Sequence, residues 1–164
     1  MSVKKRHYLS SRLTRALLEE LEKTTGIKKN ALPKKPAIEL IKSERFDLFL
    51  LDGSPTLVRV DDTLIPTLNS PLVDLLPSVV VDMGAVPHVC NGADVMVPGI
   101  VRLDDFPKDA VVVVRDEKYG KPLVVGKALL SSDEIRSSKR GRAIENLHYV
   151  GDRIWKLIKE LSRK

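Results

Sequence analysis

The sequence predicts an α+β fold in which a small α/β N-terminal domain precedes a mostly β barrel that ends in a C-terminal helix. Leucines recur near helical spacing in residues 11–25, short β-branched or apolar runs follow through residue 130, and residues 143–161 are amphipathic at helical spacing. The chain has 164 residues and 43% apolar content, which is enough to bury a core. We expect two small domains, at residues 1–76 and 77–164.

The first domain is predicted to open with a helix, because Ser10 or Ser11 is a suitable N-cap and Gly26 would end it. A proline-bounded basic connector separates this helix from three strands. The predicted strands are residues 37–42, 46–51 and 56–60. The second is central, since it is almost continuously apolar. A loop through Asp61-Asp62 and a short helix near residues 72–76 complete the domain before Pro77.

The second domain begins with a predicted strand, a one-turn helix and another strand between Val79 and Val101. Pro87 suits a helix start and Asn91-Gly92 suits a helix end, so the helix is predicted over residues 88–91. Pro98-Gly99 must interrupt the following strand, because proline cannot donate to a sheet ladder. The remaining predicted elements are strands at residues 110–115 and 123–130, a basic loop at 136–142 and a helix at 143–161.

The Val79–Val101 segment resembles the opening of a PUA domain, an RNA-binding module. Residues 120–128 resemble the PUA hairpin, and Asn146–Trp155 resembles the closing motif. The combination is most similar to the group that includes the eukaryotic malignant T-cell amplified sequence protein, whose linker resembles Pro66-Thr67-Leu68. The resemblance implies a pre-PUA domain followed by a PUA pseudo-barrel.

In PUA domains RNA generally lies against the short helix, the following glycine-containing loop and the adjoining strand. The resemblance therefore implies RNA contacts at His88, Asn91, Gly92, Ala93, Met96, Pro98 and Gly99. Asp94, in the glycine-containing loop, is not an ideal residue to contact a phosphate and could cap the turn instead. Lys127 lies either beside RNA or in a surface ion pair.

Charge is distributed in blocks along the chain. Residues 1–45 hold 12 Lys/Arg and 5 Asp/Glu, residues 46–135 hold 7 and 14, and residues 136–164 hold 9 and 3. A basic face assembled from the two chain ends would favour a polyanion. Four cations in the predicted basic loop are candidate phosphate contacts: Arg136, Lys139, Arg140 and Arg142.

Catalytic and cofactor chemistry has little support in the sequence. One cysteine and three histidines cannot supply a zinc ligand set. Asp82 and His88 suggest an acid/base pair, but no nucleophile is recognisable beside them. Neither a phosphate loop nor a dinucleotide fingerprint is present. The seven aromatics lie mostly in apolar patterns, so recognition of RNA backbone and shape is expected rather than base stacking. We predict no enzyme activity, no metal and no cofactor.

The sequence predicts a soluble cytoplasmic protein, because its apolar runs are too short to cross a membrane and its single Cys90 suits a reducing compartment. The predicted function is noncatalytic binding of structured RNA, either tRNA or rRNA. The resemblance implies a role in translation initiation or recycling at the small ribosomal subunit, with an initiation-factor-like protein as partner. Two alternatives stay open, an RNA-modification accessory that delivers substrate and a protein-protein adaptor whose basic ends meet an acidic partner.

Overall fold

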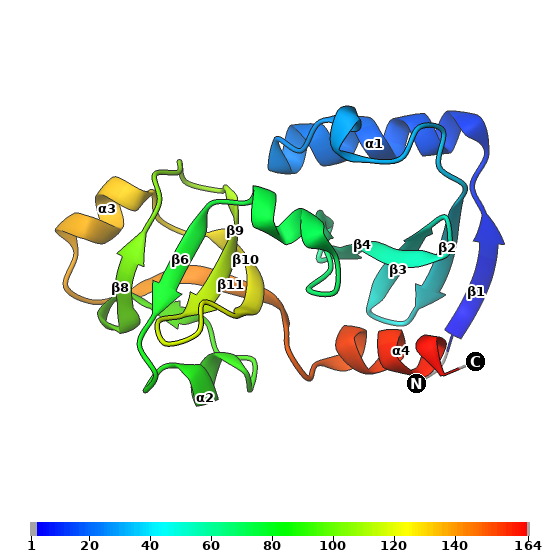
Figure 1. The fold of residues 1–164 in the computed structure, drawn as a ribbon. Helices are drawn as coiled ribbons and strands as arrows, with labels where there is room; N and C mark the ends of the chain where they lie inside the picture. Colours follow the sequence, from blue (N-terminus) through cyan, green and yellow to red (C-terminus); the bar gives the residue numbers. More distant parts are fainter. Residues whose placement is uncertain (1–2, 164) are drawn as a thin grey trace.

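The computed structural model describes residues 3–163 and consists of two β-sheet units side by side (Figure 1). The first unit is a five-stranded sheet, and the second is a six-stranded sheet that curves into a pseudo-barrel. The mixture of sheets with short helices and a C-terminal helix confirms the predicted α+β class. Within residues 3–163, no helix is long and apolar enough to cross a membrane.

The five-stranded sheet is an antiparallel meander whose strand order follows the sequence. Its strands are β1 (Val3–Tyr8), β2 (Ile38–Ser43), β3 (Phe46–Leu51), β4 (Ser54–Val60) and β5 (Thr63–Pro66). The sheet lies between helices α1 (Ser11–Thr25) and α4 (Arg153–Ser162) in Figure 1. Both helices place buried residues in the same core as β3, so β3 is buried at all but one position and is central, as predicted.

Helix α1 begins and ends as the sequence predicts. The Ser10 hydroxyl accepts a hydrogen bond from the Leu13 amide at 3.2 Å, and Gly26 ends the helix at φ 77°. The loop predicted after β4 is instead a two-residue turn. Asp61 and Asp62 have φ values of 47° and 65°, which suit a tight hairpin turn, and the chain returns as β5.

The six-stranded sheet has the order β7-β11-β10-β9-β6-β8, in which only the β6–β9 pair is parallel. Its strands are β6 (Ser78–Val81), β7 (Val95–Met96), β8 (Ile100–Leu103), β9 (Val111–Asp116), β10 (Pro122–Ala128) and β11 (Arg142–Tyr149). The short helices are α2 (Val86–Val89), α3 (Ser132–Ser137) and the 3-10 turns η1 (Lys29–Ala31), η2 (Pro71–Leu75) and η3 (Val97–Gly99). Pro98-Gly99 interrupts the strand as predicted, because η3 separates β7 from β8.

The helix predicted over residues 143–161 is wrong in its first half. Residues 142–149 form β11, which pairs with β10 and β7 and buries Ala143, Ile144 and Leu147. Gly151, at φ 93°, turns the chain. The Asp152 carboxylate then caps α4 by accepting from the Trp155 amide at 2.8 Å. Pairing on both sides of β11 overrides the helical spacing of its apolar residues.

One hydrophobic cluster spans the two units, and a second lies within the barrel. Barrel residues Val111, Val113 and Val125 pack in the same cluster as the η2 residues and α4. The segment that links the two units passes through Leu68. His148 connects this segment to the start of α4. Its fully buried ring accepts from the Leu68 amide at Nε2 (3.1 Å), so Nδ1 donates to Asp152 (2.8 Å). Helix α4 therefore completes the first unit although it follows the barrel in sequence.

Candidate nucleic-acid interface

Helix α2 forms one wall of the candidate site, and it begins earlier than predicted. The Asp82 carboxylate accepts a hydrogen bond from the Ala85 amide at 2.8 Å, which closes a turn just ahead of the helix. The helix then spans Val86–Val89 instead of residues 88–91, with Pro87 in its first turn. The sequence pattern located the proline correctly but placed the start of the helix two residues late.

Gly92 closes the turn after α2, as the sequence predicts, although the helix itself ends at Val89. Gly92 adopts φ 95°, a conformation that disfavours a side chain. Its amide donates to Val89 O at 3.2 Å while the Ala93 amide donates to His88 O at 3.1 Å, which together form a Schellman motif. A Cβ on Gly92 would also lie 3.4 Å from the Tyr149 ring. The backbone conformation, more than the packing, therefore favours glycine here.

A pocket of about 640 Å³ lies between α2, the β7–η3 segment and the start of β11. Six of the predicted RNA-binding residues line it: His88, Ala93, Met96, Pro98, Gly99 and Arg142. At its base Gly99 approaches Ala85, since a Cβ on Gly99 would lie only 3.2 Å from the Ala85 Cβ. The pocket is open to solvent, mostly apolar inside and charged at its rim.

Arg142 is the cation of this pocket, and Asp94 holds it in place. Its Nε and Nη2 donate to the same Asp94 oxygen at 2.9 and 2.5 Å. The other Asp94 oxygen accepts from the backbone amide of Asn146 at 2.8 Å, which fixes the carboxylate. The remaining N–H donors of the guanidinium are available to a ligand. Asp94 therefore positions an arginine, a role different from the turn cap considered from the sequence.

Asn146 anchors the end of α2 to β11. Its side-chain amide donates to Val89 O and Ala93 O, each at 2.9 Å. Its Oδ1 is buried and has no hydrogen-bond partner among the described residues, so the side chain is held through its donors. These bonds fix the loop that carries Ala93 and Asp94. The pocket wall is therefore preformed.

The other predicted site residues lie outside the pocket. Asn91 and Gly92 are exposed at the turn beside it, and Lys127 lies on β10 opposite Val111 and Glu145. Lys139 and Arg140 are exposed in the short loop before β11. That loop runs beside η3, since the Val97 amide donates to Gly141 O at 2.9 Å. Lys139 and Arg140 thus lie in a loop next to η3, do not line the pocket and have no defined partner among residues 3–163.

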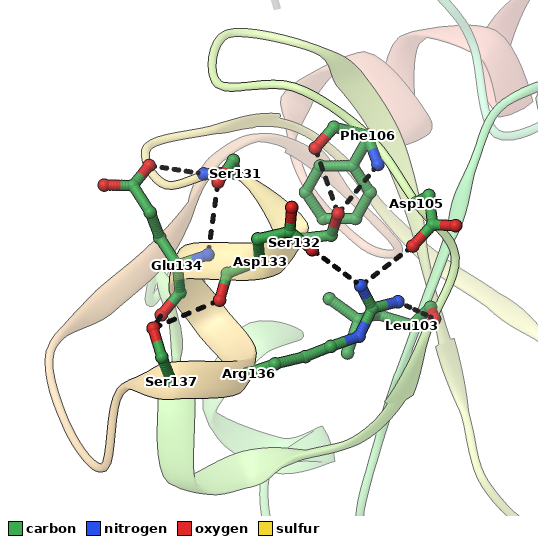
Figure 2. Close-up of polar contacts among 9 residues, drawn as sticks. All are labelled: Leu103, Asp105, Phe106, Ser131, Ser132, Asp133, Glu134, Arg136 and Ser137. Atoms are coloured by element: carbon green, nitrogen blue, oxygen red, sulfur yellow. Dashed lines mark hydrogen bonds and ion pairs between the residues drawn. The ribbon is translucent and has the colours of Figure 1, made fainter.

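Arg136 belongs to a different cluster, shown in Figure 2. The predicted loop of residues 136–142 is shorter than expected, because α3 extends to Ser137. A capping box between Ser131 and Glu134 starts this helix. The Arg136 guanidinium pairs with Asp105 at 2.8 Å and Asp133 at 3.3 Å and donates to Leu103 O at 3.2 Å (Figure 2). Three of its five N–H donors are therefore used within the protein.

Two ionisable groups near these elements have shifted pKa values. Burial raises the pKa of the Cys90 thiol at the end of α2, which disfavours the thiolate that metals and electrophiles require. Hydrogen bonds from the Ser131 amide and hydroxyl lower the pKa of Glu134. Among residues 3–163, no group of three or more His, Cys, Asp or Glu side chains is arranged to hold a metal ion.

Sequence reasoning left Asp82 and Ala85 outside the RNA-binding region, and it placed Val89, Asp94 and Val95 in RNA-facing segments without naming them as contacts. The decisive contact joins Asp94 to Arg142, which are 48 residues apart, so no local spacing reveals it. The nearest signal was Asn146 in the closing motif, whose polar side chain reaches back to the same loop.

Comparisons with known proteins agree with this architecture. A family model described as the PUA domain matches residues 77–150, and one described as a domain of unknown function, DUF1947, matches residues 5–70. A solved PUA domain structure from Aeropyrum pernix, in complex with tartrate, superposes with a TM-score of 0.84 at 31% identity, covering 96% of this chain and 92% of that one. A hypothetical protein structure from Pyrococcus horikoshii superposes with a TM-score of 0.81 at 33% identity, covering 94% and 99%.

Curated relatives cover most of the chain as well. An uncharacterized protein of Methanocaldococcus jannaschii is 42% identical over 94% of this chain and 98% of its own. Translation machinery-associated protein 20 of Saccharomyces cerevisiae is 33% identical over 85% of this chain and 82% of its own. Fold and pocket thus define a PUA-domain protein, which is a class of RNA-binding proteins. The chain belongs to the pre-PUA plus PUA family that includes Translation machinery-associated protein 20 and malignant T-cell-amplified sequence 1.

Proposed function

We propose that this protein is a noncatalytic RNA-binding protein that recognises structured RNA, either tRNA or rRNA, through the pocket beside α2. The observation that carries the proposal is the Arg142 guanidinium, fixed by Asp94 at the rim of a preformed apolar pocket. Such a site combines a phosphate contact with a cavity for an unpaired nucleotide. Lys139 and Arg140 add positive charge in the exposed loop that precedes β11.

The setting we propose is translation, at initiation or at ribosome recycling. Support comes from relatives named as translation machinery-associated proteins, which align over most of this chain. The small ribosomal subunit and an initiation-factor-like protein are the proposed partners, and the proposed location is the cytoplasm. No membrane contact is part of the proposal.

Binding to tRNA, isolated small subunits and an unstructured single strand across a salt series tests this function. We expect tRNA or subunits to bind more tightly than the unstructured strand, with a salt dependence that reports phosphate contacts. The triple change Lys139→Ala/Arg140→Ala/Arg142→Ala should weaken that binding. Equal affinity for every RNA would leave only charge attraction and would contradict structured-RNA recognition.

Catalysis is tested separately by incubating the protein with undermodified RNA. We expect no change in the mass of the RNA, because the pocket holds neither an activated nucleophile nor a metal-binding cluster in the described chain. A mass change would favour the RNA-modification alternative.

A further inference from the structure

Residues 3–163 form two sheets with four edge strands, and three of these are short, buried or covered, which protects them against pairing with another chain. Strand β5 is buried at three of its four positions and packs near α1. Strand β7 has only two residues. Natural proteins commonly shorten or cover edge strands, because unpaired backbone groups invite association.

The third protected edge is β8, and Arg136 covers it. The Asp104 amide donates to Ser78 O on β6 at 2.9 Å, so in an antiparallel pair the backbone groups of Leu103 point away from β6. The Leu103 carbonyl accepts from the Arg136 guanidinium instead (Figure 2). An arginine that the sequence assigned to RNA binding thus satisfies a strand edge.

Strand β1 is the fourth edge, and it is open. It is the outer strand of its sheet (Figure 1). All six of its side chains are exposed. The Leu9 amide donates to Ile38 O on β2, so alternate residues Lys5 and His7 also face β2. The backbone N–H and C=O groups of Arg6 and Tyr8 therefore point outward.

The side chains of β1 determine what could pair with this edge. The strand carries Lys4, Lys5, Arg6 and His7 in succession. Arg6 is paired with Glu39 at 2.7 Å, whereas no carboxylate of residues 3–163 lies within 4.0 Å of the Lys4 or Lys5 ammonium. A second copy of β1 would place these cations against like charges, which disfavours self-pairing. An acidic strand would place carboxylates beside them.

We propose that β1 is the docking edge for an acidic, extended segment of a partner protein, which adds to the five-stranded sheet as a further strand. Backbone hydrogen bonds to Arg6 and Tyr8 would supply affinity, and carboxylates facing Lys4 and Lys5 would select the segment. Tyr8, 67% exposed, offers its ring to one face of the added strand. This surface is separate from the RNA pocket and does not depend on it.

The test uses the full chain, labelled for NMR, and a short capped peptide of alternating glutamate and valine. Binding should slow hydrogen exchange of the Arg6 and Tyr8 amides by about tenfold when most of the protein is occupied. The same peptide with N-methylated amides keeps the charge but loses its donors, and we expect no protection from it.

Two variants separate charge from strand addition. Lys4→Glu/Lys5→Glu should weaken peptide binding by about tenfold, while the matched change Lys118→Glu/Lys121→Glu in the β9–β10 turn should alter it less than about twofold. Tyr8→Pro removes an outward amide without touching the bonds to β2, and it should also abolish protection at Arg6. Unchanged unfolding curves confirm that each variant is folded.

Three outcomes would overturn the proposal. No protection at millimolar peptide would show that the edge is closed to acidic strands. Equal binding of the N-methylated peptide would reduce the effect to charge. Displacement of the peptide by a short RNA that binds more tightly to Lys4 and Lys5 would make β1 an RNA surface instead.

Discussion

The pocket beside α2 and the open edge of β1 both present cations to solvent, but the protein supports them in opposite ways. In the pocket, Asp94 holds Arg142 and accepts in turn from the backbone amide of Asn146. The Asn146 side chain anchors the neighbouring loop. On β1 no side chain is buried, and Arg6 is fixed only by Glu39 at the surface.

This difference indicates two modes of recognition. A guanidinium held in one geometry costs a ligand little ordering entropy and can discriminate the shape of what it meets. Lysines on an exposed strand supply charge but are not held in one orientation. Selectivity for a partner must therefore come from the backbone hydrogen-bonding groups at the edge of β1. Mutations in the two regions should therefore differ in both the size and the kind of their effects.

The largest effect is expected where β11, which carries Arg142 and Asn146, meets β10. A Cβ on Gly126 would lie 2.4 Å from Glu145 O and 2.6 Å from the Ile144 side chain, so Gly126→Ala must displace backbone. We expect a loss of about 3 kcal/mol in the free energy of unfolding, measured in urea. Gly84→Ala, whose Cβ would meet only the Asp82 side chain at 3.3 Å, is the matched control. Equal urea midpoints for the two variants would show that the close approach of Gly126 to β11 does not exclude a side chain.

The next effect is expected at the anchor of the pocket wall. Asn146→Ala removes the side-chain donor to Ala93 O and one of the two donors to Val89 O, which should cost about 2 kcal/mol of stability and weaken RNA binding as the loop loosens. Asn91→Ala, at the exposed turn beside the pocket, should change neither quantity measurably. If both variants bind RNA like the wild type, the pocket wall does not need its anchor.

A smaller effect, with an informative sign, is expected from Asp94→Asn. The substitution adds one unit of positive charge but removes the carboxylate that aims Arg142. If the orientation of the Arg142 guanidinium decides affinity, the affinity for RNA should fall several-fold, which corresponds to roughly 1 kcal/mol of binding free energy. Tighter binding in a filter assay would mean that net charge decides instead.

The smallest effect on stability is expected on β1. Lys4→Glu/Lys5→Glu should change the free energy of unfolding by less than about 0.5 kcal/mol, because neither side chain is buried. A larger loss in urea unfolding would show that these lysines support the sheet, and would weaken their assignment to a partner.

Local chemistry made part of this structure predictable. Ser10 and Gly26 mark the ends of α1, and Gly92 marks the end of α2, because caps and left-handed turns depend on a few adjacent residues. The resemblance to the PUA domain named five residues that line the pocket, and the cluster of cations in residues 136–142 named a sixth, Arg142. Whether these residues contact RNA stays a prediction.

Non-local contacts limited the rest. Residues 142–149 have helical spacing but are a strand because β10 and β7 pair with them from both sides. Strand β1 has no apolar alternation to reveal it, since nothing covers either of its faces. The neighbouring arginines Arg136 and Arg142 look alike in sequence, yet one meets Asp105 and Leu103 while the other meets Asp94.

Those two arginines provide the most direct test of the central claim. Binding of tRNA should be measured across a salt series for the wild type, Arg142→Ala and Arg136→Ala, which lose the same charge. We predict that Arg142→Ala weakens binding by about tenfold and lowers the salt slope by about one, while Arg136→Ala stays within about twofold of the wild type. Equal losses for the two variants would contradict an RNA site built around Arg142 and would leave only general electrostatic attraction.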